Sequence, residues 1–547
     1  SLEWGDFDND GDLDVVANGE QQAGGNASTL LFRNNGSSFS QVSPVPFSNL
    51  KEGGAKFIDF DNDNDLDVVV MGQNASNTPL LILYQNMGNS SFVPVLNSGL
   101  TGLYRGGLDV ADYNNDGYAD LVTTGLDISG NLRTILYTNI GGTFQESSID
   151  LIGLYDGDIA WHDGSDRFPD LIISGKGFLG DSYTLYYQNF EGDLTRLGGN
   201  NLLFPMAESS IATNNRDKDG FYEYVVMGAE ALNSQAFVYR AGDQTEALPG
   251  FQHGDIVWVD YDSDGDNDLV MTGINLQSNQ VQTRLYRNTN DNYTLVCGAL
   301  PEEGNNQSRL AVADYDQDGD LDLMFTSFDS MGVAFGRLYR NDSSSVNSPP
   351  SLPTALSVSA NCNVLEISWN QANDNESPSH NLTYAIKVGT SIGGNDIYPG
   401  LALPNGNRLL TGEGNNGSHT SIRIPVSVSG QYYVGLQTID NGYAASGFMI
   451  DSIDVVIVLD SQLVISELSA QWPYANGKST QTVLFDLDEN GFPDIFMKTR
   501  RGSLNPSIDS TWVMYNDGSD FSIQTLLEHE EIGYFRDFDD YNGDGLP

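Results

Sequence analysis

The sequence has few basic residues and no long apolar run, and each shortage excludes a class of protein. Against 75 Asp+Glu there are 24 Lys+Arg, which gives a formal net charge of −51 over 547 residues. Binding to nucleic acid phosphates needs a basic surface, so we expect no nucleic-acid partner. The longest apolar run is the five residues Val455–Leu459, whereas a membrane helix needs about 20. We therefore expect no membrane span in this segment.

Cysteine and proline are also scarce. The two cysteines, Cys297 and Cys362, fall in segments that we assign to different domains, so we expect buried free thiols rather than a disulfide. With 59 Gly and only 19 Pro, the composition favours short strands joined by tight turns. Ser1 begins almost on a motif and Pro547 ends inside another, so we interpret the sequence as a segment of a longer chain.

One acidic phrase recurs along the sequence. It reads Asp-Phe-Asp-Asn-Asp-Gly-Asp-Leu-Asp from Asp6 to Asp14, and it is followed by small and β-branched residues. Its starts are residues 6, 59, 112, 162, 215, 260 and 314, and, after a long gap, 486 and 540. A fixed period of about 50 residues indicates a repeat architecture.

A second phrase recurs with the same period as the acidic one. An aromatic-x-Asn phrase follows most starts at a nearly constant distance, as in Phe32–Asn34, Tyr84–Asn86 and Tyr137–Asn139. Each unit then has room for about four short strands, which is the size of a propeller blade. The fold class that we predict is all-β, with a seven-bladed β-propeller over residues 1–342.

The seventh unit predicts how the ring closes. After Asn341 the chain passes directly into a Ser/Pro-rich linker, residues 343–353, and leaves no room for a fourth strand. We predict that a strand from before Ser1 completes this blade, so that the first and last blades share a sheet and no edge stays exposed.

The rest of the chain predicts two further domains. Residues 354–460 lack the repeat and alternate as a two-sheet sandwich does, for example in Leu365–Trp369 and Tyr432–Thr438. Residues 461–547 resume the repeat, which predicts the first blades of a second, truncated propeller. The alternative is a sandwich inserted into one larger ring.

The acidic loop has the chemistry of a calcium site. In Asp-x-Asp-x-Asp-Gly-x-x-Asp, positions 1, 3, 5 and 9 offer side-chain oxygens, position 7 offers its backbone carbonyl, and glycine at position 6 permits the sharp turn. Hard oxygen donors without His or Cys select Ca²⁺, which accepts six to eight oxygens. Without a cation, carboxylates at this spacing repel one another. We expect about seven Ca²⁺ ions, one for each intact loop.

The predicted side-chain ligands fall into sets of differing quality. The full sets are Asp6, Asp8, Asp10 and Asp14; Asp59, Asp61, Asp63 and Asp67; Asp260, Asp262, Asp264 and Asp268; and Asp314, Asp316, Asp318 and Asp322. Sets with one Asn are Asp112, Asn114, Asp116 and Asp120, and Asp486, Asp488, Asn490 and Asp494. The weaker or incomplete sets are Asn215, Asp217, Asp219 and Glu223, and Asp540, Asn542 and Asp544. The position-7 carbonyls are those of Asp12, Asp65, Tyr118, Phe221, Asp266, Asp320 and Phe492. In the loop at 162–170, His162 and Gly164 replace two ligands, so we expect that loop to be empty.

These phrases resemble FG-GAP/VCBS repeats, the blades of propellers like those of integrin α-subunits. The resemblance covers about 1–342 and 461–547, and residues 354–460 resemble a fibronectin type III domain. In this combination the chain is similar to large secreted bacterial surface proteins. The resemblance implies extracellular, calcium-stabilised modules for adhesion or scaffolding, secreted or held at the cell surface.

Three functions fit the sequence. The first is a non-enzymatic binding or scaffolding segment whose partner is an extracellular protein or glycan. The second is a carbohydrate-binding propeller, in which Tyr118, Phe168, Phe221 and Phe492 at position 7 stack on sugars. The third is a targeting module of a larger secreted enzyme. We predict no catalytic residues, because the five histidines are scattered among different units and the carboxylates are spaced as metal ligands.

Overall fold

All regular structure in the described part of the chain is β-strand. A computed structural model describes residues 1–457, except 37, 89–90, 164–166, 198–202, 217–221, 231–232, 241–242, 291, 301–306, 330, 344 and 362, together with 478–485, 494–501, 508–516 and 521–530. Within these residues there is no helix suited to crossing a membrane. The predicted all-β fold class is confirmed.

Antiparallel sheets follow one another along residues 2–339, and we number them blade 1 to blade 7. Blades 1 to 3 contain β1 (Leu2–Gly5), β2 (Asp14–Glu20), β3 (Ala27–Asn34) and β4 (Phe39–Gln41); β5 (Ala55–Ile58), β6 (Asp67–Gln73), β7 (Pro79–Asn86) and β8 (Phe92–Pro94); and β9 (Leu108–Ala111), β10 (Asp120–Leu126), β11 (Leu132–Asn139) and β12 (Phe144–Glu146). Blades 4 and 5 contain β13 (Tyr155–His162), β14 (Asp170–Lys176), β15 (Ser182–Phe190) and β16 (Asp193–Arg196); and β17 (Ala207–Arg216), β18 (Tyr222–Glu230), β19 (Asn233–Arg240) and β20 (Asp243–Pro249). Blades 6 and 7 contain β21 (Gln252–Val259), β22 (Asp268–Asn275), β23 (Gln280–Arg287) and β24 (Thr294–Leu295); and β25 (Arg309–Ala313), β26 (Asp322–Phe328) and β27 (Ala334–Tyr339).

Consecutive blades bury a shared apolar core, and the second strand of each blade contributes to two of them. In β6, Val68 and Val70 pack with blade 1, whereas Val69 and Met71 pack with blade 3. Side chains alternate between the faces of a strand, so a strand buried on both faces needs an unbroken apolar run. This explains the β-branched residues that follow each acidic loop.

The ring closes by packing between blade 7 and blade 1. Trp4 and Val15 of blade 1 share a buried cluster with Ala311 and Ala313 of blade 7. In the described residues blade 7 has three strands and blade 1 has four of its own, and the predicted sheet shared between them stays a prediction. The additional strand from before Ser1 stays a prediction.

Buried asparagines tie blades 1, 2, 3 and 4 to the blade before, and they are the last residues of the aromatic-x-Asn phrases. The Asn86 side chain donates to the carbonyl of Phe7, at 2.8 Å, and the Asn139 side chain donates to that of Phe60, at 2.7 Å. Asn34 donates to the carbonyl of Tyr315, at 3.0 Å, and so closes the ring between blades 7 and 1. The acceptor is in each case the residue at position 2 of the neighbouring acidic loop.

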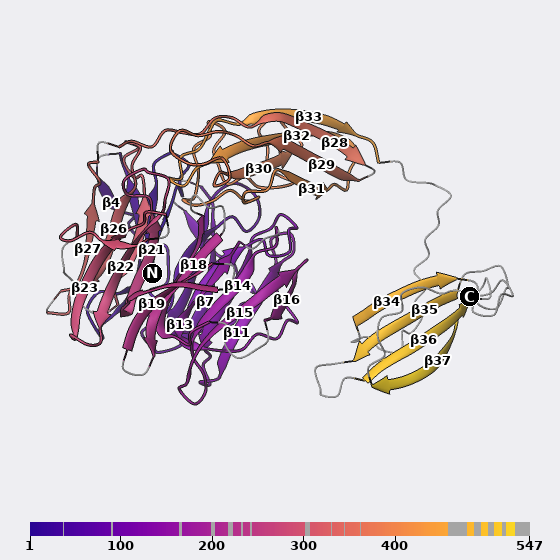
Figure 1. Ribbon diagram of the computed structural model, residues 1–547, viewed down its shortest axis with the longest axis horizontal. Helices are drawn as coiled ribbons and strands as arrows, with labels where there is room; N and C mark the ends of the chain where they lie inside the picture. Colours follow the sequence, from indigo (N-terminus) through magenta and orange to yellow (C-terminus); the bar gives the residue numbers. More distant parts are fainter. Residues whose placement is uncertain are drawn as a thin grey trace. The chain divides into compact units, whose positions relative to one another are not determined.

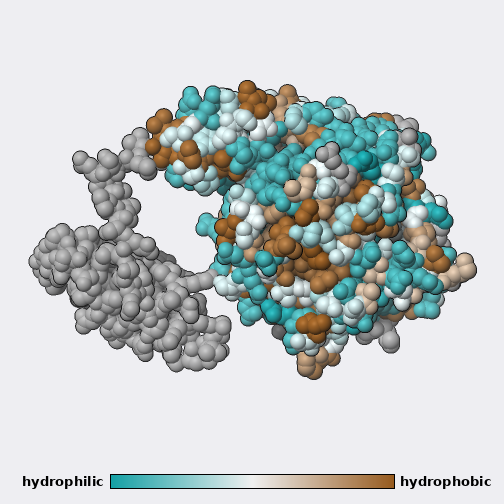
Figure 2. Space-filling model, turned by 180° about the vertical axis from the view of Figure 1, so that it is seen from behind, coloured by the Kyte–Doolittle hydropathy of each residue, from teal (hydrophilic) through white to brown (hydrophobic). Residues whose placement is uncertain are grey.

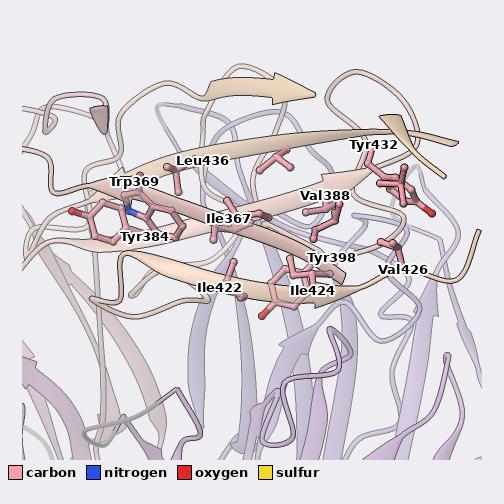
Figure 3. Close-up of a cluster of buried hydrophobic side chains, with 14 of the residues drawn as sticks. Ile367, Trp369, Tyr384, Val388, Tyr398, Ile422, Ile424, Val426, Tyr432 and Leu436 are labelled. Carbon is pink, nitrogen blue, oxygen red and sulfur yellow. The ribbon is translucent and has the colours of Figure 1, made fainter. Parts of the chain in front are cut away.

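Residues 354–455 form two three-stranded sheets that face each other. One sheet contains β28 (Thr354–Asn361), β29 (Val364–Asn370) and β31 (Ser421–Pro425), and the other contains β30 (Thr383–Gly389), β32 (Gly430–Ile439) and β33 (Met449–Val455). Figure 3 shows their side chains meeting in the space between the sheets, with Trp369 against Tyr384. This pair of sheets, which we call the sandwich, forms one compact unit with the blades over residues 1–458. Its fibronectin type III assignment stays a prediction.

The second compact unit spans residues 459–547. Its described strands are β34 (Lys478–Phe485), β35 (Asp494–Arg501), β36 (Ile508–Asn516) and β37 (Phe521–Glu530), which form one antiparallel sheet in that order. The second propeller and the predicted domain boundaries stay predictions. Cys297 is a free thiol and is exposed, so the expectation that it is buried was wrong. Cys362 lies outside the described residues.

The sandwich covers one end of the blades (Figure 1). Its loop around Leu409 reaches blade 1, where the Asp6 amide donates to the Leu409 carbonyl at 2.9 Å. Leu409 is fully buried in the core that blades 1 and 2 share. The rest of the visible surface is mainly hydrophilic, with one apolar area among the blades (Figure 2).

The asparagine ties predict a large cost for Asn139→Ala. The change leaves the carbonyls of Phe60 and Ala119 buried without their donor, which should lower the free energy of unfolding by about 2–4 kcal/mol. Asn131→Ala is the control in the same blade, because Asn131 is exposed and bonds only within its turn. Urea unfolding in calcium compares the two, and equal losses would contradict the role of the tie.

Candidate metal centres

Each acidic loop joins the first strand of a blade to the second. Position 1 follows the first strand, as Asp6 follows β1, and position 9 opens the second strand, as Asp14 opens β2. The hairpin therefore brings positions 1 and 9 together without any contact from a distant segment. Blades 1, 2, 3, 6 and 7 repeat this connection, so their loops lie at the same end of the blades.

Backbone amides fix the first and last ligands of each loop. The Asp59 carboxylate accepts the amides of Asp63 and Asn64, both at 3.1 Å. The Asp67 carboxylate accepts the amide of Phe60 at 3.2 Å and that of Asn86 at 2.7 Å. The same bonds recur in blades 1, 3, 6 and 7. The asparagine of the aromatic-x-Asn phrase thus supports the metal centre of its own blade and ties it to the blade before.

Carboxylates converge in four of the described loops. In each of them three carboxylates offer oxygens that lie within 4.8 Å of one another. The groups are Asp6, Asp8 and Asp10; Asp59, Asp61 and Asp67; Asp260, Asp262 and Asp268; and Asp314, Asp316 and Asp322. The structure therefore brings together members of all four full sets that the sequence predicted.

The carboxylate at position 3 has one oxygen that lacks a hydrogen-bond partner in three of these groups. One oxygen of Asp8 is held by Arg33 at 2.6 Å, and one oxygen of Asp61 is held by Gln85 at 2.7 Å. The other oxygen, Oδ1, is buried without a hydrogen-bond partner in Asp8, Asp61 and Asp316. A buried polar atom normally has a partner. Three converging oxygens with one of them unpartnered fit a bound Ca²⁺ ion, which takes oxygen ligands only.

Burial and mutual repulsion raise the pKa of the buried carboxyls. Burial is the largest cause, and it raises the pKa of Asp59 to about 7 and that of Asp67 to about 9, with a smaller contribution from neighbouring carboxylates. In blade 6 the pKa of Asp260 rises to about 7 and that of Asp268 to about 9 for the same reasons. Without a cation these loops therefore hold protons near neutral pH.

Blade 3 has the same loop with an asparagine at position 3. Asp112 accepts the amides of Asp116 and Gly117, and Asp120 accepts that of Asn139 at 2.7 Å. Burial raises the pKa of Asp112 to about 7 and that of Asp120 to about 9. The amide oxygen of Asn114 can replace one carboxylate oxygen as a ligand, so the prediction of a site here stands.

Blade 4 fills the place of a ligand with aromatic side chains. The Tyr186 hydroxyl donates to Asp170 at 2.5 Å, and the His162 ring lies edge-on to Tyr224 with centroids 4.8 Å apart. Tyr186 therefore places a neutral hydrogen-bond donor on one oxygen of Asp170. In the neighbouring blades the corresponding oxygen points into the acidic loop. This arrangement favours the predicted empty loop. Gly164 and Asp166 lie outside the described residues.

The remaining predicted ligands are only partly described. In blade 5 Glu223 is buried, with Arg240 at 3.4 Å from its carboxylate. Asp217, Asp219 and Phe221 lie outside the described residues, as do Asp486, Asp488, Asn490, Phe492, Asp540, Asn542 and Asp544. Of Asn215 and Asp494 only the strand position is described, and these sites stay predictions.

Position 6 of the loops has a second role that the sequence did not indicate. Gly11, Gly117, Gly265 and Gly319 have φ between +84° and +95°, and an added Cβ on each would press on residues of the linker or the sandwich. Blade 2 has Asn64 at this position, and the Asn395 side chain donates to it at 3.1 Å. Asn441 donates to the Gly265 carbonyl at 3.2 Å. The metal loops are therefore also the surface on which the sandwich rests.

The chain carries FG-GAP-like repeats. A family model described as FG-GAP-like repeat matches residues 6–70, 59–123 and 260–325, and each match begins at position 1 of an acidic loop. No curated protein matches the sequence.

Several solved structures resemble the chain weakly. One is an exo-β-1,3-galactanase from Phanerochaete chrysosporium, with 10% identity over 75% of this chain and 96% of that one and a TM-score of 0.29. Others are AofleA from Arthrobotrys oligospora (13% identity, 54% and 86%, TM-score 0.35) and an endo-arabinase from Bacteroides thetaiotaomicron (12% identity, 45% and 97%, TM-score 0.27). Scores this low decide nothing about function, and the fold rests on the strand order and the cores between blades.

The contact at position 6 predicts that Gly117→Ala is more costly than Gly130→Ala. Both glycines have positive φ, +90° and +78°, so alanine is strained at both by about 1 kcal/mol. Only Gly117 faces the Tyr398 ring, 2.9 Å from an added Cβ, whereas nothing lies near Gly130. We expect a further loss of about 1–3 kcal/mol for Gly117→Ala in urea unfolding. Equal losses would show that the sandwich contact contributes nothing.

The raised pKa values predict an unusual pH dependence for the metal-free protein. Because the folded pKa of these carboxyls, about 7 to 9, exceeds the unfolded value of 3.8, their contribution is fully present below pH 3.8 and is lost as pH rises through 7 to 9. In EDTA we expect the melting temperature to fall by roughly 5 °C or more from pH 5 to pH 8. Calcium competes with the protons, so in calcium the fall should disappear. A metal-free protein that is more stable at pH 8 would contradict these shifts.

Proposed function

We propose that this chain is a non-catalytic, calcium-stabilised binding or scaffolding segment of an extracellular protein. The observation that supports it best is the repeated group of three converging carboxylates whose position-3 oxygen is buried without a hydrogen-bond partner in Asp8, Asp61 and Asp316. These groups are too regular to be ordinary acidic turns, because each is held by the same amide bonds in successive blades.

The ligand chemistry favours calcium over other metals. The converging groups contain only oxygen donors, which suit Ca²⁺, Mg²⁺ and Mn²⁺, and three carboxylates from one short loop suit the variable coordination of Ca²⁺ better than the strict octahedron of Mg²⁺. Bound calcium would supply the positive charge that lets these carboxyls ionise. The residues of the chain do the rest: position 1 holds the turn, position 9 holds the neighbouring aromatic-x-Asn phrase, and position 6 supports the sandwich.

An extracellular location follows from the same sites. Calcium sites of extracellular modules bind with Kd of about 10⁻⁴–10⁻³ M. Such sites bind calcium at its extracellular concentration and stay empty at its cytosolic concentration. In the cytosol the carboxylates within each loop would therefore repel one another. The net charge of −51 supports solubility in that setting.

A catalytic role has little support among the described residues. The converging carboxylates accept backbone amides from fixed directions, so they are held as ligands rather than left as a proton donor and acceptor beside a substrate. We therefore propose that binding, and not turnover, is the function of this segment. Its role as the targeting module of a larger enzyme agrees with the same site.

Calcium should stabilise the full chain strongly, and magnesium should do so weakly. At free calcium about tenfold above Kd, each site adds about 1.4 kcal/mol, so several sites together should raise the melting temperature by roughly 10 °C or more. Mg²⁺ demands a smaller, octahedral shell and should give a minor shift. Differential scanning fluorimetry with calcium, magnesium and EDTA measures the shifts.

A pair of variants locates the effect in the loops. Asp61→Asn should reduce the calcium-dependent shift, because Asp61 supplies an oxygen of the blade 2 group. Asp127→Asn is the control, since Asp127 lies in a turn of blade 3 outside the acidic loops and bonds to Asn131. If EDTA left the melting temperature of the wild-type protein unchanged, the calcium proposal would be wrong.

A further inference from the structure

The blades enclose a cavity at the end opposite to the metal centres. Each first strand ends at an acidic loop and begins at this cavity, which measures about 740 Å³. Residues from all seven blades line it, among them Asn18, Glu52, Arg105, Glu208 and Arg309. The sandwich lies at the other end of the blades, and we call this cavity the channel mouth.

A ring of six left-handed residues forms the rim of this mouth. They lie just before the first strands of blades 2, 3 and 7 and at the second residue of the first strands of blades 4, 5 and 6, and their φ values lie between +49° and +68°. The six are Glu52, Arg105, Asp156, Glu208, His253 and Gln307. Each is followed by Gly or Ser. Non-glycine residues rarely adopt this conformation, and strained backbone gathers where a binding site needs fixed geometry.

Backbone hydrogen bonds join neighbouring members of the ring. The Arg105 amide donates to the Glu52 carbonyl at 2.6 Å, and the Asp156 amide donates to the Arg105 carbonyl at 2.8 Å. The Gln307 amide donates to the His253 carbonyl at 2.7 Å. These bonds hold the side chains of the rim at set positions around the cavity.

Charges of both signs line the cavity, although the chain as a whole is strongly acidic: Glu20, Glu52, Asp156 and Glu208 lie there with Arg105, Lys176 and Arg309. Arg105 forms a two-bond ion pair with Asp156, with Nε at 2.7 Å from one oxygen. Glu208 lies 2.6 Å from the Lys176 ammonium and 2.9 Å from the His253 ring. A ligand with a net charge of either sign would meet like charges here. An uncharged ligand with many hydroxyls can instead bond to both members of each ion pair.

One wall of the cavity is apolar. Leu30 and Phe32 of blade 1 and Phe328 and Phe335 of blade 7 line it, and blade 7 has three described strands. Leu30, Phe32 and Phe335 are only half-buried. The cavity thus has a rim of fixed hydrogen-bonding groups on one side and aromatic surface on the other. A sugar ring has the same two features, a rim of hydroxyls and apolar C–H faces.

We propose that this channel mouth is a binding site for a neutral carbohydrate. Arg105, Asp156, Lys176 and Glu208 would hydrogen-bond the hydroxyls, and Phe32 and Phe335 would pack on the ring faces. The site rests on the proposed function, since it names the ligand of the binding module. It differs from the predicted sugar contacts at position 7: among those, Tyr118 and Phe168 lie in loops at the covered end of the blades, where the sandwich contacts Gly117 and Arg167.

Isothermal titration of the full chain in millimolar calcium tests the site. The probes are xylohexaose, mannohexaose and cellohexaose, with trigalacturonate as the anionic comparison. We expect at least one neutral oligosaccharide to bind, and trigalacturonate to bind at least tenfold more weakly. Failure of all three neutral probes to bind to folded, calcium-loaded protein would overturn the proposal, as would tighter binding of the anionic one.

Variants in one blade then place the ligand. Arg105→Ala should weaken binding about ten- to a hundredfold, because it removes charge-assisted hydrogen bonds. Arg133→Ala is the matched control, since Arg133 pairs with Glu146 on the exposed surface of the same blade, away from the cavity. If Arg105→Ala fails to fold, Lys176→Gln and Phe335→Ala serve in its place. Binding that survives these changes but is lost in Tyr118→Ala would place the ligand at the loop end and overturn the proposal.

Melting temperatures of the same samples separate the two proposals. A protein that melts higher in calcium than in EDTA but binds no neutral oligosaccharide would keep the calcium function and lose the channel-mouth site. A protein that binds the oligosaccharide and melts alike in calcium and EDTA would keep the site and lose the calcium function.

Discussion

Burial of carboxylates at one end of the blades is the constraint on which the structure depends. Transfer of one carboxylate out of water costs several kcal/mol unless it is paired, and each intact loop places several together. Backbone amides that donate to the carboxylates at positions 1 and 9 offset part of this cost, and they fix the conformation of the loop. The oxygens that remain, such as Asp61 Oδ1, have no protein partner. A bound cation would give these oxygens a partner, and without one the raised pKa values of Asp59 and Asp67 mean that these carboxyls keep their protons to higher pH.

The same loops fasten the rest of the compact unit. Position 9 receives the aromatic-x-Asn phrase of its own blade, and the side chain of that asparagine reaches the neighbouring loop, so a disturbed loop loosens two blades. Position 6 supports the sandwich at Gly117 and Gly265. The candidate metal centres, ring closure and seating of the sandwich are therefore linked through the acidic loops. A cavity lies at the opposite end of the blades, away from the acidic loops and the sandwich.

The repeat made much of this predictable. Acidic spacing predicted the hairpin loops and their ligands, and the structure brings three predicted carboxylates together in each of four loops: positions 1, 3 and 5 in blade 1, and positions 1, 3 and 9 in blades 2, 6 and 7. The constant offset of Asn86 from Asp67 showed that the two phrases belong together, but the sequence alone did not show that the Asn86 amide donates to Asp67 or that its side chain donates to Phe7. The docking of Tyr398 on Gly117 and the rim from Glu52 to Gln307 join segments far apart in the chain. No local pattern encodes such contacts.

The measurement that tests the central claim most directly is an anomalous difference map from crystals of the chain grown in calcium. We expect anomalous peaks among the oxygens of the loops that begin at Asp6, Asp59, Asp112, Asp260 and Asp314, and none in the loop that begins at His162. Ordered loops without anomalous density, with hydrogen-bonded waters on Asp8 and Asp61 in place of an ion, would contradict it.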